Sequence, residues 1–237
     1  MGFYSMVAFF QKGGVFMYPI LLVFAVGMAI AFERWFHLNR IRIVNSRMWD
    51  VLHPVLAKGE FDKAREMVKK DKSNLAQMLE MGLARMGVVR RREDIEIAME
   101  ESMMEIIPQL EKRTPYVALL ANIATLLGLL GTIMGLIAAF TAVANANPAE
   151  KADLLSASIS VAMNTTAFGL MSAIPLLLFH AKLTSTTGHI VDSLEMASVK
   201  ALNSISDFNK RHFEAKSEYP AGNEQVAAPE PQMETAQ

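Results

Sequence analysis

The stretch TPYVALLANIATLLGLLGTIMGLIAAFTAVANANPA, residues 114–149, contains no Asp, Glu, Lys or Arg. Residues 13–32 and 154–181 are also uncharged, so the three runs are 20, 36 and 28 residues long in chain order. A helix crosses the hydrocarbon core of a bilayer with about 20 apolar residues, at roughly 1.5 Å of rise each. Each run is long enough, and the sequence therefore predicts three transmembrane helices.

The composition of the whole 237-residue chain favours a membrane protein over an ordinary soluble enzyme. Hydrophobic residues make up 52% and charged residues 20% of the chain, and the mean hydropathy is +0.24. The net charge of -1 gives no basic surface for nucleic acid. The chain has no cysteine, which excludes disulfides, thiolate catalysis and Cys-bearing zinc sites but leaves the compartment open.

Three spans divide the chain into eight predicted segments. In order these are an N-terminal stretch 1–14, a span 15–33, a helical loop 34–116, a span 117–142, a connector 143–155, a span 156–180, a helical extension 181–213 and a tail 214–237. The tail is rich in Pro, Ala, Glu and Gln, a composition typical of disorder. An odd number of spans places the two termini on opposite sides of the membrane.

Lys and Arg near the span ends predict the orientation, because cytoplasmic segments carry the excess of positive charge. The side with the loop and the C-terminus has seven such residues, whereas the other side has Lys12 and Lys151. The seven are Arg34, Arg40, Arg42, Arg47, Lys112, Arg113 and Lys182. We therefore expect the loop and the C-terminus in the cytoplasm, and the N-terminus and the connector across the membrane.

The first span could also be interpreted as a secretory signal, since Lys12 precedes an apolar stretch and Ala29-Ile30-Ala31 resembles a cleavage site. Cleavage would leave two spans, with both charged regions outside. Tyr18, Trp35 and Phe36 instead suit the two interfaces of a retained helix. We predict that the span is retained.

The loop and the C-terminal extension show helical periodicity. Apolar residues recur three or four positions apart at Phe61, Ala64 and Val68, at Ile95, Met99, Met103, Ile106 and Leu110, and at Val191, Leu194, Val199, Leu202, Ile205 and Phe208. Pro54 is expected to begin or kink a helix that ends before Gly59, and Gly82 with Gly87 and Arg90–Arg92 predicts a turn. We expect the third span to continue into the cytoplasm as one long helix.

Small and polar residues are concentrated in two motifs within the second and third spans. The first is LLGLLGTIMG at 126–135, and the second is NTTAFGLMSAIP at 164–175. Glycines let membrane helices approach closely, and polar groups at this depth face protein or water rather than lipid. The residues predicted to serve helix packing are Gly128, Gly131, Gly135, Gly169 and Pro175.

Together with the three-span layout and the large loop, these motifs resemble the MotA/TolQ/ExbB family of ion-channel stator proteins, and its three-span TolQ/ExbB branch in particular. The match rests on Leu126–Gly135 with Phe140, and on Thr166–Leu170 with Ala173–Pro175. The resemblance extends from about residue 10 to 212 and implies an all-α pentameric ring in a bacterial inner membrane. It also implies a partner, a dimer of a single-span ExbD/TolR/MotB-like protein with an essential membrane aspartate.

The resemblance places the family's pore-facing threonines at Thr132 and Thr166. Thr165, Asn164 and Thr125 are further candidates for the ion pathway, because Thr125 and Thr132 share a helix face and the other two lie beside Thr166. A single membrane threonine most often only returns a hydrogen bond to its own helix. A cluster of them favours a functional role.

Two positions depart from the family pattern. Val161 stands where TolQ and ExbB carry a membrane glutamate, and Thr125 stands where a proline commonly precedes the first motif. The missing glutamate and the doubled Thr165-Thr166, which resembles that of sodium-driven MotA-type stators, leave both H⁺ and Na⁺ open as the transported ion. No cofactor or resident metal is implied.

The predicted function is an ion-conducting subunit that, with its partner, converts an ion gradient into mechanical work in the cell envelope. A non-conducting membrane scaffold, in which the polar residues serve only packing, is the alternative. An enzyme is disfavoured, because His180, His189 and His212 have no metal-ligand spacing and no nucleophile–base pair is apparent. The sequence leaves open which envelope process is powered.

Overall fold

The computed structural model describes residues 14–86 and 91–217. Within these ranges the chain forms helices and no strand: α2 (Met17–Ala57), α3 (Phe61–Lys70), α4 (Asn74–Arg85), α5 (Arg92–Glu111), α6 (Thr114–Asn145) and α7 (Lys151–Ser217). The predicted all-α class is confirmed. The predicted segments 1–14 and 214–237 lie almost entirely outside the described residues, as do Lys12, Gly87 and Arg90.

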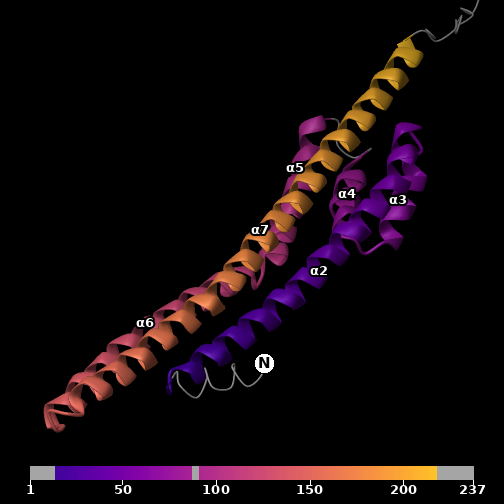
Figure 1. Cartoon of the computed structure of the whole chain (residues 1–237). Helices are drawn as coiled ribbons and strands as arrows, with labels where there is room; N and C mark the ends of the chain where they lie inside the picture. The colour runs from indigo at the N-terminus through magenta and orange to yellow at the C-terminus, as the bar shows by residue number, and fades with distance from the viewer. Residues whose placement is uncertain (1–13, 87–90, 218–237) are drawn as a thin grey trace, which may run out of the picture.

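Within residues 14–86 and 91–217, three stretches are long and apolar enough to cross a membrane: Met17–Ala57, Arg92–Ala144 and Lys151–Phe208. In the apolar 18-residue part of each stretch, only 22%, 22% and 33% of the residues, in chain order, are buried inside this chain. Most of the apolar side chains therefore face outward, where lipid or neighbouring protein would cover them. In this part of the molecule α6 runs along the N-terminal half of α7, with α2 beside them (Figure 1).

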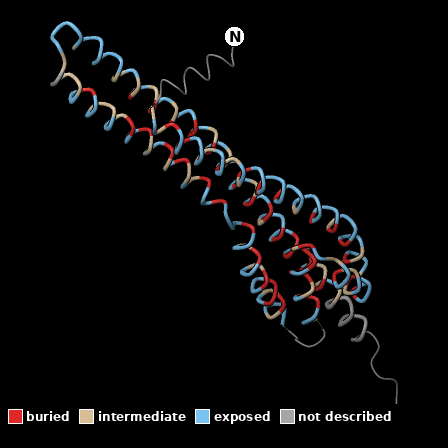
Figure 2. Tube along the Cα trace, turned by 90° about the horizontal axis from the view of Figure 1, so that it is seen from below, coloured by how far each residue is buried: buried red, intermediate tan, exposed pale blue. Residues whose placement is uncertain are grey.

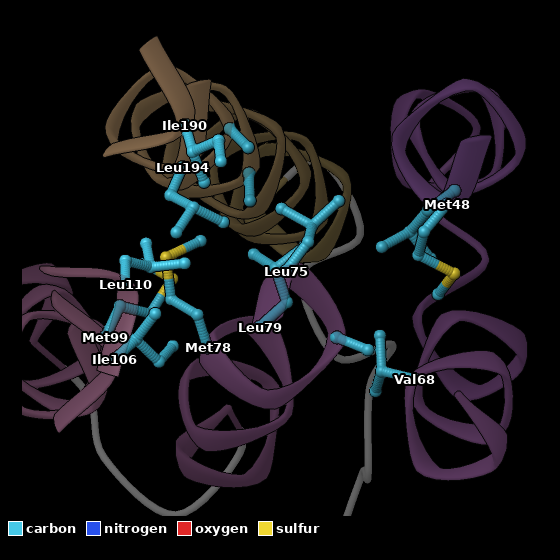
Figure 3. Packing of buried hydrophobic residues seen from close by; sticks show 14 of the residues in the cluster. Met48, Val68, Leu75, Met78, Leu79, Met99, Ile106, Leu110, Ile190 and Leu194 are labelled. Atoms are coloured by element: carbon cyan, nitrogen blue, oxygen red, sulfur yellow. The ribbon is translucent and has the colours of Figure 1, made fainter. Parts of the chain in front are cut away.

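The other end of the molecule is a helical bundle with a hydrophobic core. Here α3, α4 and α5 pack against the C-terminal parts of α2 and α7 (Figure 1), and buried positions are frequent (Figure 2). Figure 3 shows the α4 side chains Leu75, Met78 and Leu79 directed toward those of α5 and α7. The third predicted span does continue into this bundle as a single helix.

The predicted apolar stripes form this core, with one exception. Phe61, Ala64 and Val68 of α3 are buried, as are Ile95, Met99, Ile106 and Leu110 of α5 and Leu194, Leu202 and Ile205 of α7. Val199, however, is 51% exposed, and Ser198 is buried in the stripe instead. Val199 lies five residues after Leu194, which rotates it by about 140° from that side chain around a helix of 3.6 residues per turn.

Two of the predicted breaks lie inside helices. Pro54 belongs to α2 and does not begin a separate helix; α2 ends instead before Gly59, whose φ is +77° and whose N–H donates to Leu56 O at 3.0 Å. Gly82 is buried within α4, where an added Cβ would lie 2.7 Å from Met99 Cγ. This glycine serves the close approach of α4 to α5 rather than a turn.

Arg113 lies at the junction of α5 and α6 and has a left-handed backbone with φ +66°. Its guanidinium donates to the Glu33 carboxylate of α2 at 3.0 Å. Pro115 occupies the first turn of α6, where its fixed φ suits the start of a helix. The start of α6 therefore contacts α2 through this ion pair.

Candidate functional site

The predicted packing glycines lie where α6 and α7 contact each other. A Cβ added to Gly169 would lie 2.8 Å from Ala124 O and 3.0 Å from the Cα of Gly128. One added to Gly135 would lie 2.7 Å from the Cβ of Ala162, and one added to Gly131 would overlap the methyl group of Thr165. The two backbones can approach this closely only because these positions lack side chains. Pro175 lies inside α7 and is half-buried.

Thr132 of α6 and Thr166 of α7, here called the threonine pair, are hydrogen-bonded to each other through their hydroxyls. The backbone carbonyl of Gly128 is within reach of both, at 3.0 Å from Thr166 Oγ1 and 3.3 Å from Thr132 Oγ1. Thr132 Oγ1 is also 3.3 Å from the carbonyl of Ala162 on α7. The two hydroxyls have two protons for these contacts, so several donor arrangements are available to the pair.

The threonine pair occupies membrane depth. Thr166 is close to the middle of the uncharged run 154–181, and both threonines are half-buried in the single chain. Each hydroxyl can donate one hydrogen bond and accept others. The pair can therefore solvate a cation, or relay a proton through water, at a depth where lipid offers no polar group.

The other predicted pathway residues are placed differently. Thr165 is 2% exposed, and its hydroxyl donates to Val161 O of its own helix at 2.9 Å. Asn164 is half-buried on the same turn of α7. Thr125 is exposed on α6 and donates to Ala121 O at 3.2 Å. The hydroxyls of the threonine pair thus join the two helices.

Sequence reasoning missed two features of the structure. One is the Gly128 carbonyl, which a helix normally uses only for its own ladder. The other is Arg34, which is 4% exposed and donates from Nη2 to Leu110 O in the last turn of α5, where helix carbonyls lack intrahelical partners. The position of an arginine just after an apolar span does not reveal whether its guanidinium reaches solvent or is buried, because both arrangements occur at span ends.

Within the described ranges, no three His, Asp or Glu side chains are grouped as a metal site requires. The polar groups at membrane depth that join α6 and α7 are hydroxyls and backbone carbonyls. Such neutral oxygens suit the transient solvation of a cation rather than its tight retention.

A family model described as the MotA/TolQ/ExbB proton channel family matches residues 70–196, a range that contains both membrane motifs. The chain belongs to the MotA/TolQ/ExbB family. The predicted family is thereby confirmed, and the protein is a multi-pass membrane protein of a proton-channel family rather than of an enzyme family.

Similar proteins extend the match over most of the chain. ExbB-like protein 1 of Synechocystis, named as a biopolymer transport protein, is 30% identical over 190 residues, which cover 77% of this chain and 72% of that protein. The ExbB homolog of Methanothermobacter thermautotrophicus is 26% identical over 196 residues, covering 82% and 68%. The solved C. jejuni MotAB structure has the same fold, with a TM-score of 0.57 at 15% identity over 92% of this chain and 89% of that chain.

Proposed function

We propose that this protein is the ion-conducting stator subunit of an inner-membrane motor that acts with an ExbD/TolR/MotB-like partner. The observation that carries the proposal is the threonine pair, which joins α6 and α7 at membrane depth in a chain of a proton-channel family. In this arrangement the N-terminus and the 143–155 connector are periplasmic, and the bundle of α3–α5 is cytoplasmic.

The proposed mechanism uses the hydroxyls as partial replacements for the water that an ion loses on entering the membrane. The partner's aspartate supplies the negative charge, and the ring offers it alternately solvated and protein-facing environments. The gradient provides about 2.3 kcal/mol per elementary charge for each 100 mV. Thr132 and Thr166 form the lining of this pathway, with Thr165, Asn164 and Thr125 near it.

A homopentamer around two partner helices is the proposed assembly. One chain leaves large apolar side chains of α6 exposed within its span, among them Leu126, Leu129, Ile133, Ile137 and Phe140. Glycines let α6 and α7 pack so closely that no space for an ion is left between them. A conducting path therefore requires additional chains. Outward apolar faces of this kind suit contact with neighbouring copies and lipid.

Thr166→Val tests the proposal, because it keeps the shape of the side chain and removes one hydroxyl. The protein is reconstituted with its partner in liposomes, and proton and sodium uptake are measured at a fixed membrane potential. We expect the flux to fall at least about tenfold, corresponding to roughly 1.4 kcal/mol or more in the barrier, while Thr166→Ser, the matched control, retains most of it. A non-conducting scaffold would give no partner-dependent flux in any of the three proteins.

The same vesicles identify the ion. Sodium is replaced by potassium at an unchanged proton-motive force, first in the wild type and then in Thr165→Ala. If the flux does not change when sodium is replaced, H⁺ is the transported ion. If the flux is lost, and Thr165→Ala changes how it depends on the sodium concentration, Na⁺ is the transported ion.

A further inference from the structure

A second polar site lies at the junction of α5 and α6 beside α7. A groove of about 480 Å³ is lined there by the ends of α5 and α6 and by one face of α7. Its polar lining consists of Glu111, Thr114, His180, Thr184, Thr187 and Asp192. Thr187 is 21 residues beyond Thr166 on the same helix, which places the groove about 30 Å further toward the bundle.

Two hydroxyls in this groove have no hydrogen-bond partner among the residues that the structure describes. Thr114 and Thr187 are each 5% exposed, and the Oγ1 of each is buried without a hydrogen bond. Buried hydroxyls in native proteins are nearly always satisfied, by water where protein does not serve. A groove of this volume with several polar groups has ample room for water. The two hydroxyls therefore indicate a hydrated site.

The charge of the groove favours cations. The Glu111 and Asp192 side chains line it, and no Lys or Arg is among its described lining residues. Arg113 is paired with Glu33 at 3.0 Å. Lys182 is two residues from Thr184, about 200° around α7 and hence on the opposite side of the helix.

We propose that this groove is a hydrated-cation site that forms the cytoplasmic mouth of the ion pathway. The oxygens of the two buried hydroxyls accept hydrogen bonds from the ion's water or coordinate the ion itself. The two carboxylates attract cations into the groove. Because no three carboxylates or imidazoles among the described residues are grouped as direct ligands, the cation keeps much of its water. The role as a mouth rests on the proposed function, whereas cation binding in the groove does not.

The chain is suited to a cysteine-labelling test because it contains no cysteine. Gly188 lines the groove, and a Cβ added there meets nothing within 4 Å, so Gly188→Cys fits without repacking. Ser185→Cys, at an exposed position of α7, is the matched control. The probes are two methanethiosulfonates, one with a trimethylammonium and one with a sulfonate head, each of which forms a disulfide with the thiolate and releases methanesulfinate.

The measured quantity is the ratio of the reaction rate with the cationic reagent to the rate with the anionic reagent. We expect this ratio to be at least about tenfold higher for Gly188→Cys than for Ser185→Cys. Glu111→Gln with Asp192→Asn should bring this ratio to the control value. An equal ratio at the two positions would overturn the cation site, whether or not the protein conducts ions.

Flux through labelled protein tests the role as a mouth. Attachment of the cationic group at 188, but not at 185, should reduce partner-dependent flux severalfold. Thr187→Val should also reduce it, whereas Thr186→Val should not, because the Thr186 hydroxyl is already bonded to Lys182 O at 2.8 Å. Full flux through protein labelled at 188 refutes the mouth alone, while absence of flux in the wild type refutes the proposed function and the mouth together.

Discussion

Thr166 reaches the backbone of the neighbouring helix because the contact beneath it is made of glycine. Its hydroxyl is 3.0 Å from Gly128 O, one turn away from Thr132 on α6. A side chain at Gly128 or Gly169 would separate the two backbones, since each added Cβ would meet main-chain atoms of the other helix. The polar contact therefore depends on the packing residues as much as on the threonines.

Gly169→Ala is expected to destabilise the protein by about 1–3 kcal/mol, the range for overpacking a well-packed contact. The added methyl would lie 2.8 Å from Ala124 O, and a backbone carbonyl cannot move aside as a side chain can. Thermal unfolding of the purified protein in detergent measures the effect.

Gly188→Ala is the control for this substitution, because it lies on the same helix and its Cβ meets nothing within 4 Å. It should be neutral or stabilising by up to about 1 kcal/mol, since alanine is the better helix former. Equal unfolding midpoints for the two variants would refute the close contact of α6 with α7 at Gly169.

At the scale of elements, the junction of α5 and α6 combines a strained backbone with a charge pair. Arg113 has φ +66°, a conformation that costs a residue with a Cβ roughly 1–2 kcal/mol. Its pair with Glu33 is about half exposed on both sides, and such pairs contribute roughly 0–1 kcal/mol. The strain is therefore at least as large as the gain from the pair.

Comparing Arg113→Gly with Arg113→Ala isolates this strain, because both substitutions remove the ion pair and only glycine is relaxed at this φ. We expect the glycine variant to be the more stable by about 1 kcal/mol in apparent unfolding free energy in detergent. Glu33→Gln, which removes the charge on the other side, should cost less than about 1 kcal/mol. Equal stability of the glycine and alanine variants would contradict a left-handed junction.

The whole molecule has two ends that need different surroundings. The bundle end buries side chains of α3, α4 and α5 in its own core, whereas the span end exposes apolar residues of α2, α6 and α7. Buried positions are accordingly denser toward the bundle end of the trace (Figure 2). A surface of this kind is stable only against lipid or protein. This division supports the proposal that assembly occurs through the spans.

Native mass measurement in a mild detergent should show five copies of the 26.2 kDa chain together with two copies of the partner. A stable complex of one chain with one partner would refute the pentamer.

The sequence by itself determined the three apolar spans, the helical stripes of the bundle and the family, because each rests on local properties. Charge-free length predicts a span, and period 3.6 predicts a buried face wherever one helix packs continuously, as at Ile95, Met99 and Ile106. The two membrane motifs are likewise contiguous in the chain. Local patterns of this kind need no knowledge of which helices become neighbours.

Only the tertiary structure decided which polar groups meet. Thr132 and Thr166 are 34 positions apart in the chain, yet their hydroxyls are hydrogen-bonded. The helix period places Thr125 on the same face of α6 as Thr132, but Thr125 is exposed. Arg34 is buried because its partner carbonyl lies at the end of α5, a contact across 76 residues. The helical period shows which residues share a face of a helix, but it does not show which other helix packs against that face. That choice depends on the angle at which the packed helices cross.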